Sequence, residues 1–146
     1  MKIFTSYFAN LTALKNCGIT PISIARYSPR NWTGERMTWL APTPYMISGN
    51  CPHEEYVERY KEICQRVNVE WFLRQLNQIG GGGDVALLCY ERPGDFCHRH
   101  MLAEHLNSLG LDVKEFNAII YMSEQSRGET KPPEPEPPKP EQLSLF

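Results

Sequence analysis

The folded part of this sequence has no excess of either charge. The chain has 15 Lys and Arg residues against 17 Asp and Glu residues, and 12 of each sign lie before residue 123. A neutral surface lacks the long-range field that drives nonspecific binding to nucleic acid. If the protein works at DNA, we therefore expect a partner to recruit it, with basic character confined to a local pocket.

Long apolar runs and an even set of cysteines are also missing. No run approaches the roughly 20 apolar residues that a membrane-spanning helix needs. The odd number of cysteines and the lack of an N-terminal signal segment argue against a secreted disulfide scaffold. We therefore expect a cytoplasmic protein that does not contact a membrane; its five cysteines are Cys17, Cys51, Cys64, Cys89 and Cys97.

Apolar residues are absent from residues 131–141, which hold six of the 12 prolines. Such a segment cannot build a core, and in a polyproline conformation its eleven residues would extend about 34 Å at about 3.1 Å per residue. We expect an α/β domain over residues 1–122, a disordered Pro-rich linker over residues 123–141 and a separate terminal peptide over residues 142–146.

The terminal peptide is Gln142-Leu-Ser-Leu-Phe146. Apolar residues beyond a segment that cannot fold are typical of a peptide that binds a groove on another protein. The pentapeptide resembles the motif by which bacterial polymerases and repair proteins bind the DNA sliding clamp. The resemblance implies that Gln142 hydrogen-bonds at the pocket mouth, while the apolar subsites take Leu143, Leu145 and Phe146. The alternative is that these residues dock onto their own domain.

The order of elements predicts a compact three-layer α/β domain with a small, mostly parallel sheet flanked by helices. A short helix after Asn10 ends at Gly18 between two strands, which is typical of a parallel βαβ unit. The unbroken apolar run Val85-Ala-Leu-Leu-Cys89 is typical of a strand buried on both faces. The expected strands are residues 2–8, 19–27, 84–90 and 113–116.

Three longer helices are expected around the buried strand. Apolar residues recur at helical spacing over residues 54–67, and Asn68 is a plausible cap for a second helix that ends at Gly80. Asp95 is a plausible cap for a third helix over residues 96–109. The long aromatic-rich connection over residues 28–49 is interpreted as a lid or pocket wall.

The candidate site follows the buried strand. Ligands of open α/β sheets bind beyond the carboxyl ends of the strands, and free amides at a helix start favour an anion and a thiolate. We predict that Cys97 is a nucleophile and that His98 is a general acid or base. Cys89 and Glu91 complete the catalytic candidates, and the predicted anion-binding residues are Arg26, Arg92 and Arg99.

Each of these residues has a plainer interpretation. Cys89 is an inert apolar filler in a buried strand, His98 packs or caps, and Glu91 pairs with a neighbouring arginine. Cys89, Cys97, His98 and His100 offer metal ligands, but paired Cys-x-x-Cys spacing is missing, so we expect no structural zinc. No metal or other cofactor is assigned, and a catalytic metal stays open.

Several segments resemble the domain of unknown function 488 family, in its phage- and bacterium-associated branch. They are Ala86-Leu-Leu-Cys-Tyr-Glu91, Gly94-Asp-Phe-Cys-His-Arg99 and Leu102-Ala-Glu104, with further matches at Tyr7–Asn10, Pro21–Arg26 and Leu40–Thr43. The Cys97-His-Arg99 element is the most specific part. The resemblance implies a compact α/β fold with a three-layer core and no settled reaction. Many members carry Asp before the arginine that matches Arg26, where this chain has Ala25.

Three functions fit these observations. The first is an enzyme on a nucleotide, a nucleic acid or another phosphorylated ligand, recruited to the bacterial sliding clamp by the terminal peptide. The alternative is a non-catalytic clamp-binding adaptor or inhibitor of host replication or repair. The third is a small-molecule or redox sensor that uses Cys89 and Cys97.

Overall fold

The computed structural model of the 146-residue chain describes residues 1–91 and 96–130. Its contacts divide the chain into two units, residues 1–116 and residues 117–146. The second unit contains helix α5 (Ala118–Thr130). The expected domain boundary at Met122 falls inside this helix, so the segment expected as a linker from residue 123 begins with helical residues. The rest of the expected linker and the terminal peptide lie outside the described residues.

A five-stranded sheet organises the first unit. The strands lie side by side in the order β3-β2-β4-β1-β5, and every pair is parallel. This confirms the predicted α/β class and the predicted parallel sheet. The strands are β1 (Ile3–Tyr7), β2 (Thr20–Ser23), β3 (Glu35–Arg36), β4 (Val85–Cys89) and β5 (Val113–Glu115).

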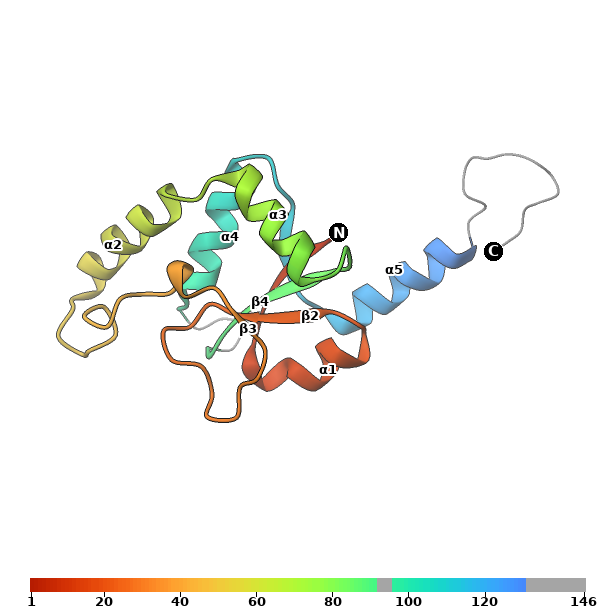
Figure 1. The fold of residues 1–146 in the computed structure, drawn as a ribbon, viewed down its shortest axis with the longest axis horizontal. Coiled ribbons are helices and arrows are strands. Elements are labelled where there is room, and N and C mark those ends of the chain that lie inside the picture. Colours follow the sequence, from red (N-terminus) through yellow and green to blue (C-terminus); the bar gives the residue numbers. More distant parts are fainter. Residues whose placement is uncertain (92–95, 131–146) are drawn as a thin grey trace. The chain divides into compact units, whose positions relative to one another are not determined.

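Helices cover both faces of the sheet (Figure 1). Helix α1 (Leu11–Asn16) follows β1 on one face, after a 3-10 turn, η1 (Phe8–Asn10). The other face carries α2 (His53–Gln65), α3 (Val69–Ile79) and α4 (His98–Ser108). The chain therefore leaves the neighbouring strands β1 and β4 toward opposite faces, which is the arrangement that opens a crevice at the carboxyl edge of such a sheet.

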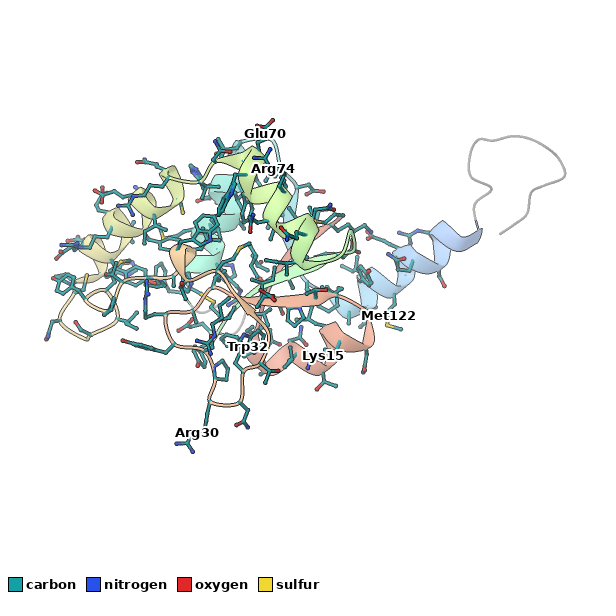
Figure 2. The ribbon with its side chains drawn as sticks, viewed as in Figure 1. Lys15, Arg30, Trp32, Glu70, Arg74 and Met122 are labelled. Carbon is teal, nitrogen blue, oxygen red and sulfur yellow. A yellow bond between two sulfur atoms is a disulfide. The ribbon has the colours of Figure 1, made fainter. Side chains whose placement is uncertain are left out.

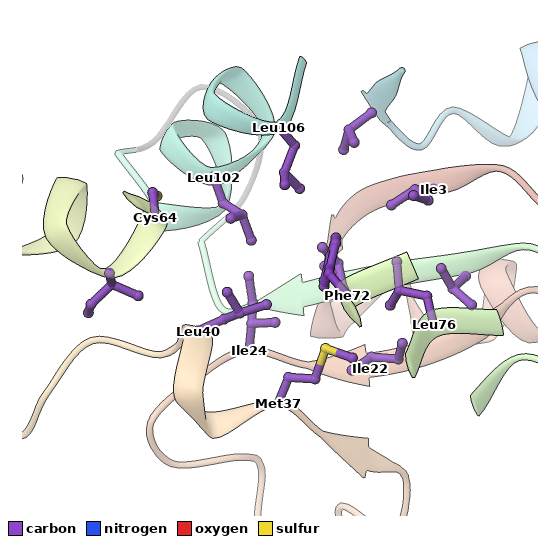
Figure 3. Packing of buried hydrophobic residues seen from close by; sticks show 14 of the residues in the cluster. Ile3, Ile22, Ile24, Met37, Leu40, Cys64, Phe72, Leu76, Leu102 and Leu106 are labelled. Atoms are coloured by element: carbon purple, nitrogen blue, oxygen red, sulfur yellow. The ribbon is translucent and has the colours of Figure 1, made fainter. Parts of the chain in front are cut away.

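The main core lies between the sheet and the helices α2, α3 and α4. Ile3 of β1 and Ile22 of β2 belong to one buried cluster with residues of all three helices (Figure 3). Every residue of β4 is buried, as the unbroken apolar run predicts for a central parallel strand. Because side chains alternate along a strand, Val85 and Leu87 join this core and Cys89 continues on the same face.

Both ends of α3 follow the sequence signals. The Asn68 side chain accepts a hydrogen bond from the Trp71 amide at 2.9 Å, which is the predicted cap. Gly80 follows the last helical residue, and a Cβ there would lie 2.7 Å from Cγ1 of Val85. The glycine is therefore required by the close approach of the helix end to β4.

Other boundaries differ from the expectation. The connection over residues 28–49 contains the two-residue strand β3 and a 3-10 turn, η2 (Thr38–Leu40), and Leu40 is fully buried. Figure 2 shows Arg30 and Trp32 on the part of this connection that lies between β2 and β3. Asn10 occupies the N-cap position of α1, but its side chain donates to Ser6 Oγ instead of capping the helix.

Helix α4 begins at His98, two residues later than expected, with Cys97 in the N-cap position. Phe96 and Cys97 are not helical, and the backbone of Cys97 is extended, so their amides do not belong to the first helical turn. The expected cap, Asp95, lies outside the described residues. The described part of the chain contains no helix long and apolar enough to cross a membrane.

Candidate functional site

A cavity of about 450 Å³ lies beyond the carboxyl ends of β2 and β4. The segments after these two strands form one part of its wall, and the long connection, the start of α2 and the residues around the start of α4 form other parts. Its lining residues are Ala25, Arg26, Tyr27, Pro42, Ile47, Cys51, His53, Tyr56, Cys89, Tyr90, Glu91, Phe96, Cys97 and His98. Pro42 and Ile47 belong to the long connection, which confirms that this connection supplies a pocket wall.

Arg26 is the basic side chain of the described lining. Its Nε donates to the Pro42 carbonyl at 2.8 Å, and Nη2 lies 3.4 Å from the Thr38 carbonyl. These neutral acceptors position the guanidinium without neutralising it. Among the described residues no carboxylate forms an ion pair with Arg26. Arg26 therefore presents a positive charge to the cavity.

Cys89 and Cys97 meet at the base of the cavity as a disulfide. Cys89 ends β4 and Cys97 precedes α4, and their Cα atoms lie 7.4 Å apart. Their exposed fractions are 1% and 2%. The sequence predicts that both thiols belong to one site, but it does not predict the bond between them.

His98 is fixed in one tautomer. Its Nε2 lies 2.8 Å from the Ile24 carbonyl. Because a carbonyl oxygen only accepts hydrogen bonds, Nε2 carries the proton and Nδ1 has a free lone pair. Nδ1 lies 3.8 Å from Cys97 Sγ. The ring also packs edge-on against Tyr60, whose hydroxyl donates to the Leu40 carbonyl at 2.7 Å.

Burial makes this imidazole a poor proton acceptor in the disulfide form. Desolvation lowers the pKa of His98 from 6.5 to about 4, and the nearby Arg99 charge acts in the same direction, against the raising effect of the Ile24 hydrogen bond. A disulfide carries no charge that would offset this. In the reduced form a Cys97 thiolate 3.8 Å away would favour the imidazolium and raise this pKa.

Arg99 is fully buried and lies behind the cavity rather than in its wall. Its Nε and Nη2 donate to the two carboxylate oxygens of Glu115, at 3.1 Å and 3.0 Å. Its Nη1 donates to Cys89 Sγ at 3.0 Å and also to the Glu91 carbonyl. Thr5 adds a hydroxyl donor to Glu115 at 2.7 Å. The guanidinium thus connects α4, β4 and β5, and it holds the sulfur of Cys89.

Aromatic rings from the start of α2 and from the segment before α4 form another part of the wall. Phe96 contacts both His53 and Tyr56 edge-on, with ring centroids 4.7 Å and 5.4 Å apart. Burial and the charge of Glu91 raise the pKa of Tyr56 above its ordinary value, so its hydroxyl stays protonated. This wall provides flat apolar surfaces and a neutral hydroxyl donor.

The structure brings most of the predicted site residues together. Arg26, Cys89, Glu91, Cys97 and His98 all line the one cavity. Arg99 lies beside it, with its fork of donors occupied by Glu115. Outside the described residues lie Arg92 and the peptide residues Gln142, Leu143, Leu145 and Phe146.

Sequence reasoning missed Glu115, Tyr56 and His53 as neighbours of the site. Glu115 had a usable signal, because it ends a parallel strand and the carboxyl ends of parallel strands meet at one edge. Tyr56 and His53 had none. They lie at the start of α2, and only the path of the preceding connection brings that start to the edge of the sheet.

The fold and the cavity define a small α/β protein with a disulfide, an imidazole and a guanidinium at the carboxyl edge of a parallel sheet. The chain belongs to the domain of unknown function 488 family: residues 10–110 match the model of DUF488-N3a, described as the active DUF488-N3 subclade. No curated protein and no solved structure matches the chain.

Proposed function

We propose that the protein is a thiol-dependent enzyme that acts on a nucleotide, a nucleic acid or another phosphorylated ligand. In this proposal the C-terminal peptide recruits the enzyme to the bacterial sliding clamp. The observation that carries the enzymatic part is the separation of 3.8 Å between Cys97 Sγ and the unprotonated Nδ1 of His98, which places a base beside this sulfur once the disulfide is reduced, at a cavity of about 450 Å³. The description of the matching subclade as active agrees with an enzymatic role.

The proposed chemistry is nucleophilic catalysis by the reduced form. His98 Nδ1 accepts the thiol proton of Cys97, and the thiolate attacks an electrophilic centre of the ligand. The bond from that centre to its leaving group breaks as the bond to sulfur forms, and the His98 imidazolium returns the proton to the leaving group. Water then cleaves the bond to sulfur and restores the thiol. The Ile24 carbonyl orients the ring, as the third member of a nucleophile, base and orienting group. Cys89 is the second thiol of the site, and Arg99 holds its sulfur in place.

Arg26 indicates which chemical class of ligand the cavity binds. A guanidinium at a cavity wall, paired with no described carboxylate, binds phosphate or carboxylate through charge-assisted hydrogen bonds. The rings of Tyr56 and Phe96 line the same cavity and supply flat surfaces on which a nucleobase would stack. A phosphorylated ligand with an aromatic base would use both the guanidinium and these rings.

Binding of nucleoside monophosphates to the reduced full chain tests this class. Arg26→Gln should weaken binding about 10–100-fold, since a charged hydrogen bond contributes about 1.5–3 kcal/mol. Arg30→Gln is the matched control, because Arg30 is exposed and lies outside the lining of the cavity. Titration calorimetry measures both. Equal affinities for the two variants would exclude Arg26 as the anion-binding residue.

Recruitment to the clamp rests on the sequence Gln142-Leu-Ser-Leu-Phe146, which lies outside the described residues. Surface plasmon resonance with an immobilised bacterial sliding clamp tests it. The full chain should bind, and a variant with Leu145→Ala and Phe146→Ala should lose measurable binding, because both apolar anchors are removed. Ser144→Ala is the control and should bind like the parent. Binding that survives loss of both anchors would remove the clamp from the account.

Alanine variants at Cys97 and His98, tested beside the variant that lacks the Leu145 and Phe146 side chains, distinguish an enzyme from a non-catalytic adaptor. An adaptor would retain its effect on replication or repair with alanine at Cys97 and His98 and lose it without the anchors. An enzyme would need both parts.

A further inference from the structure

We propose that the reduced protein binds a zinc ion through Cys89, Cys97 and His98, and that the bound ion blocks the reactivity of Cys97. The ligand atoms of these residues all lie within 4.8 Å of one another, and all three side chains are buried. Within residues 1–91 and 96–130, no other group of three or more His, Cys, Asp and Glu residues is arranged to hold a metal ion.

The spacing of the donors suits one tetrahedral ion. With Zn–S of about 2.3 Å and Zn–N of about 2.0 Å, two ligand atoms of a tetrahedral site lie roughly 3.5–3.8 Å apart. The lower value, about 3.5 Å, applies to a sulfur and a nitrogen ligand. Cys97 Sγ and His98 Nδ1 lie 3.8 Å apart, so a small shift would bring them to it. The Cα atoms of the two cysteines are 7.4 Å apart, and reduction frees their sulfurs to separate.

Outer contacts orient these donors as they do in zinc sites. Ligating histidines usually donate the other ring N–H to a carboxylate or a backbone carbonyl, and His98 donates Nε2–H to the Ile24 carbonyl at 2.8 Å. On the thiol side, Arg99 Nη1 donates to Cys89 Sγ at 3.0 Å. This positive charge favours the thiolate form, which is the form that ligates a metal.

The fourth position would face the cavity. Two thiolates and one imidazole leave one tetrahedral position open, as in zinc sites that bind water or substrate. Glu91, Cys97 and His98 line the same space. A water molecule or an anionic ligand in the cavity would therefore reach the ion.

One Zn²⁺ ion reacts with two neutral thiols and one neutral imidazole to give the three-ligand complex and two free protons. The disulfide form cannot react in this way. A dithiol reductant must first donate two electrons and two protons to the Cys89–Cys97 bond and become a disulfide itself.

Blocking of Cys97 rests on the proposed function, whereas binding of zinc does not. The ion would occupy both the thiolate of Cys97 and the lone pair of His98 Nδ1, which are the two groups that the proposed nucleophile needs. Zinc and thiol chemistry would therefore exclude one another at this site.

Metal titration of the full chain, reduced and kept free of oxygen, tests the inference. We expect one Zn²⁺ per chain, release of two protons in weakly buffered solution, and a cobalt(II) complex with a thiolate charge-transfer band. Loss of a residue that only contacts a metal ligand typically lowers metal affinity about 10–100-fold. Cys89→Ser, Cys97→Ser and His98→Gln should each lower zinc affinity by more than this. Cys64→Ser is the matched control, because Cys64 is a buried cysteine of α2 that does not line the cavity.

Two results would overturn the inference. The first is a reduced parent protein that binds no zinc or gives a cobalt(II) spectrum without the thiolate band. The second is unchanged affinity in the Cys97→Ser and His98→Gln variants. The proposed function is tested separately, with a metal chelator present, by the reactivity of Cys97 and by ligand binding at Arg26. Either proposal can therefore fail while the other stands.

Discussion

At the scale of single residues, His98 determines most of the chemistry of the site. Its exposed fraction is 5%, its Nε2–H is held by a backbone carbonyl, and its ring packs against Tyr60. These surroundings suit the neutral imidazole. The imidazolium would lose its hydration and would be repelled by the Arg99 charge. Folding of the disulfide form therefore disfavours protonation of this residue.

The lowered pKa of His98 leads us to expect that stability depends on pH. The pKa of His98 falls from 6.5 to about 4 on folding. The unfolded chain then binds more protons between these values, so the stabilisation is complete above pH 6.5 and is lost as the pH falls toward 4. At about 1.4 kcal/mol per unit, the contribution is about 3 kcal/mol.

Urea unfolding of the oxidised protein between pH 7 and pH 4 measures this effect. His98→Gln keeps an amide donor for the Ile24 carbonyl but cannot be protonated. The parent should lose about 3 kcal/mol more than this variant over the range. Parallel pH profiles for the two proteins would show that His98 is not buried as a neutral ring.

At the scale of elements, the ion pair of Arg99 and Glu115 joins α4 to β5. The arginine side chain is fully buried and the Glu115 side chain is 28% exposed. Removal of one partner from such a pair leaves an uncompensated charge in the protein, which is far more costly than loss of a surface pair.

Glu115→Gln should therefore lower the free energy of unfolding by about 3 kcal/mol. The control is Glu55→Gln, which breaks the pair of Glu55 with Arg59 on the surface of α2, where both side chains are more than one third exposed. That change should cost no more than about 0.5 kcal/mol. Denaturant unfolding compares the two variants, and equal losses would contradict a structural role for the buried pair.

The elements also show how far the sequence predicts this fold. β4 and α3 were predictable, because an unbroken apolar run, an Asn cap and a terminal Gly each reflect the physics of one segment. β3 was not, since it consists of Glu35 and Arg36, both exposed, and it forms only because β2 lies beside it. The start of α4 was misplaced because an acidic residue before an aromatic one resembles a cap, whereas Cys97 takes the cap position.

The candidate site was predictable to the same extent. A parallel sheet collects the residues that follow its strands at one edge, so Arg26, Cys89 and Glu91 could be expected in one place, with Cys97 and His98 shortly after them. The role of Arg99 could not be read from its neighbours in the sequence. Its partner Glu115 belongs to another strand, and only the folded sheet shows that the guanidinium is already paired.

At the scale of the whole molecule, we assign catalysis and recruitment to different parts of the chain. The domain places the sulfur of Cys97, an imidazole and a guanidinium around one cavity, and the terminal peptide would bind the partner that recruits the protein. A body with equal numbers of basic and acidic residues cannot rely on long-range attraction to nucleic acid. Recruitment by a protein partner therefore fits the neutral domain.

The central claim is that the reduced protein holds Cys97 as a reactive thiolate next to His98. Alkylation of the reduced, metal-free full chain by iodoacetamide, resolved by mass spectrometry for each cysteine across a range of pH, tests it most directly. Cys97 should react faster than a free thiol at neutral pH, and phosphate-containing ligands should slow its alkylation. His98→Gln should remove this rate advantage. A Cys97 that reacts no faster than a free thiol, with the same pH profile in the His98→Gln variant, would contradict the account.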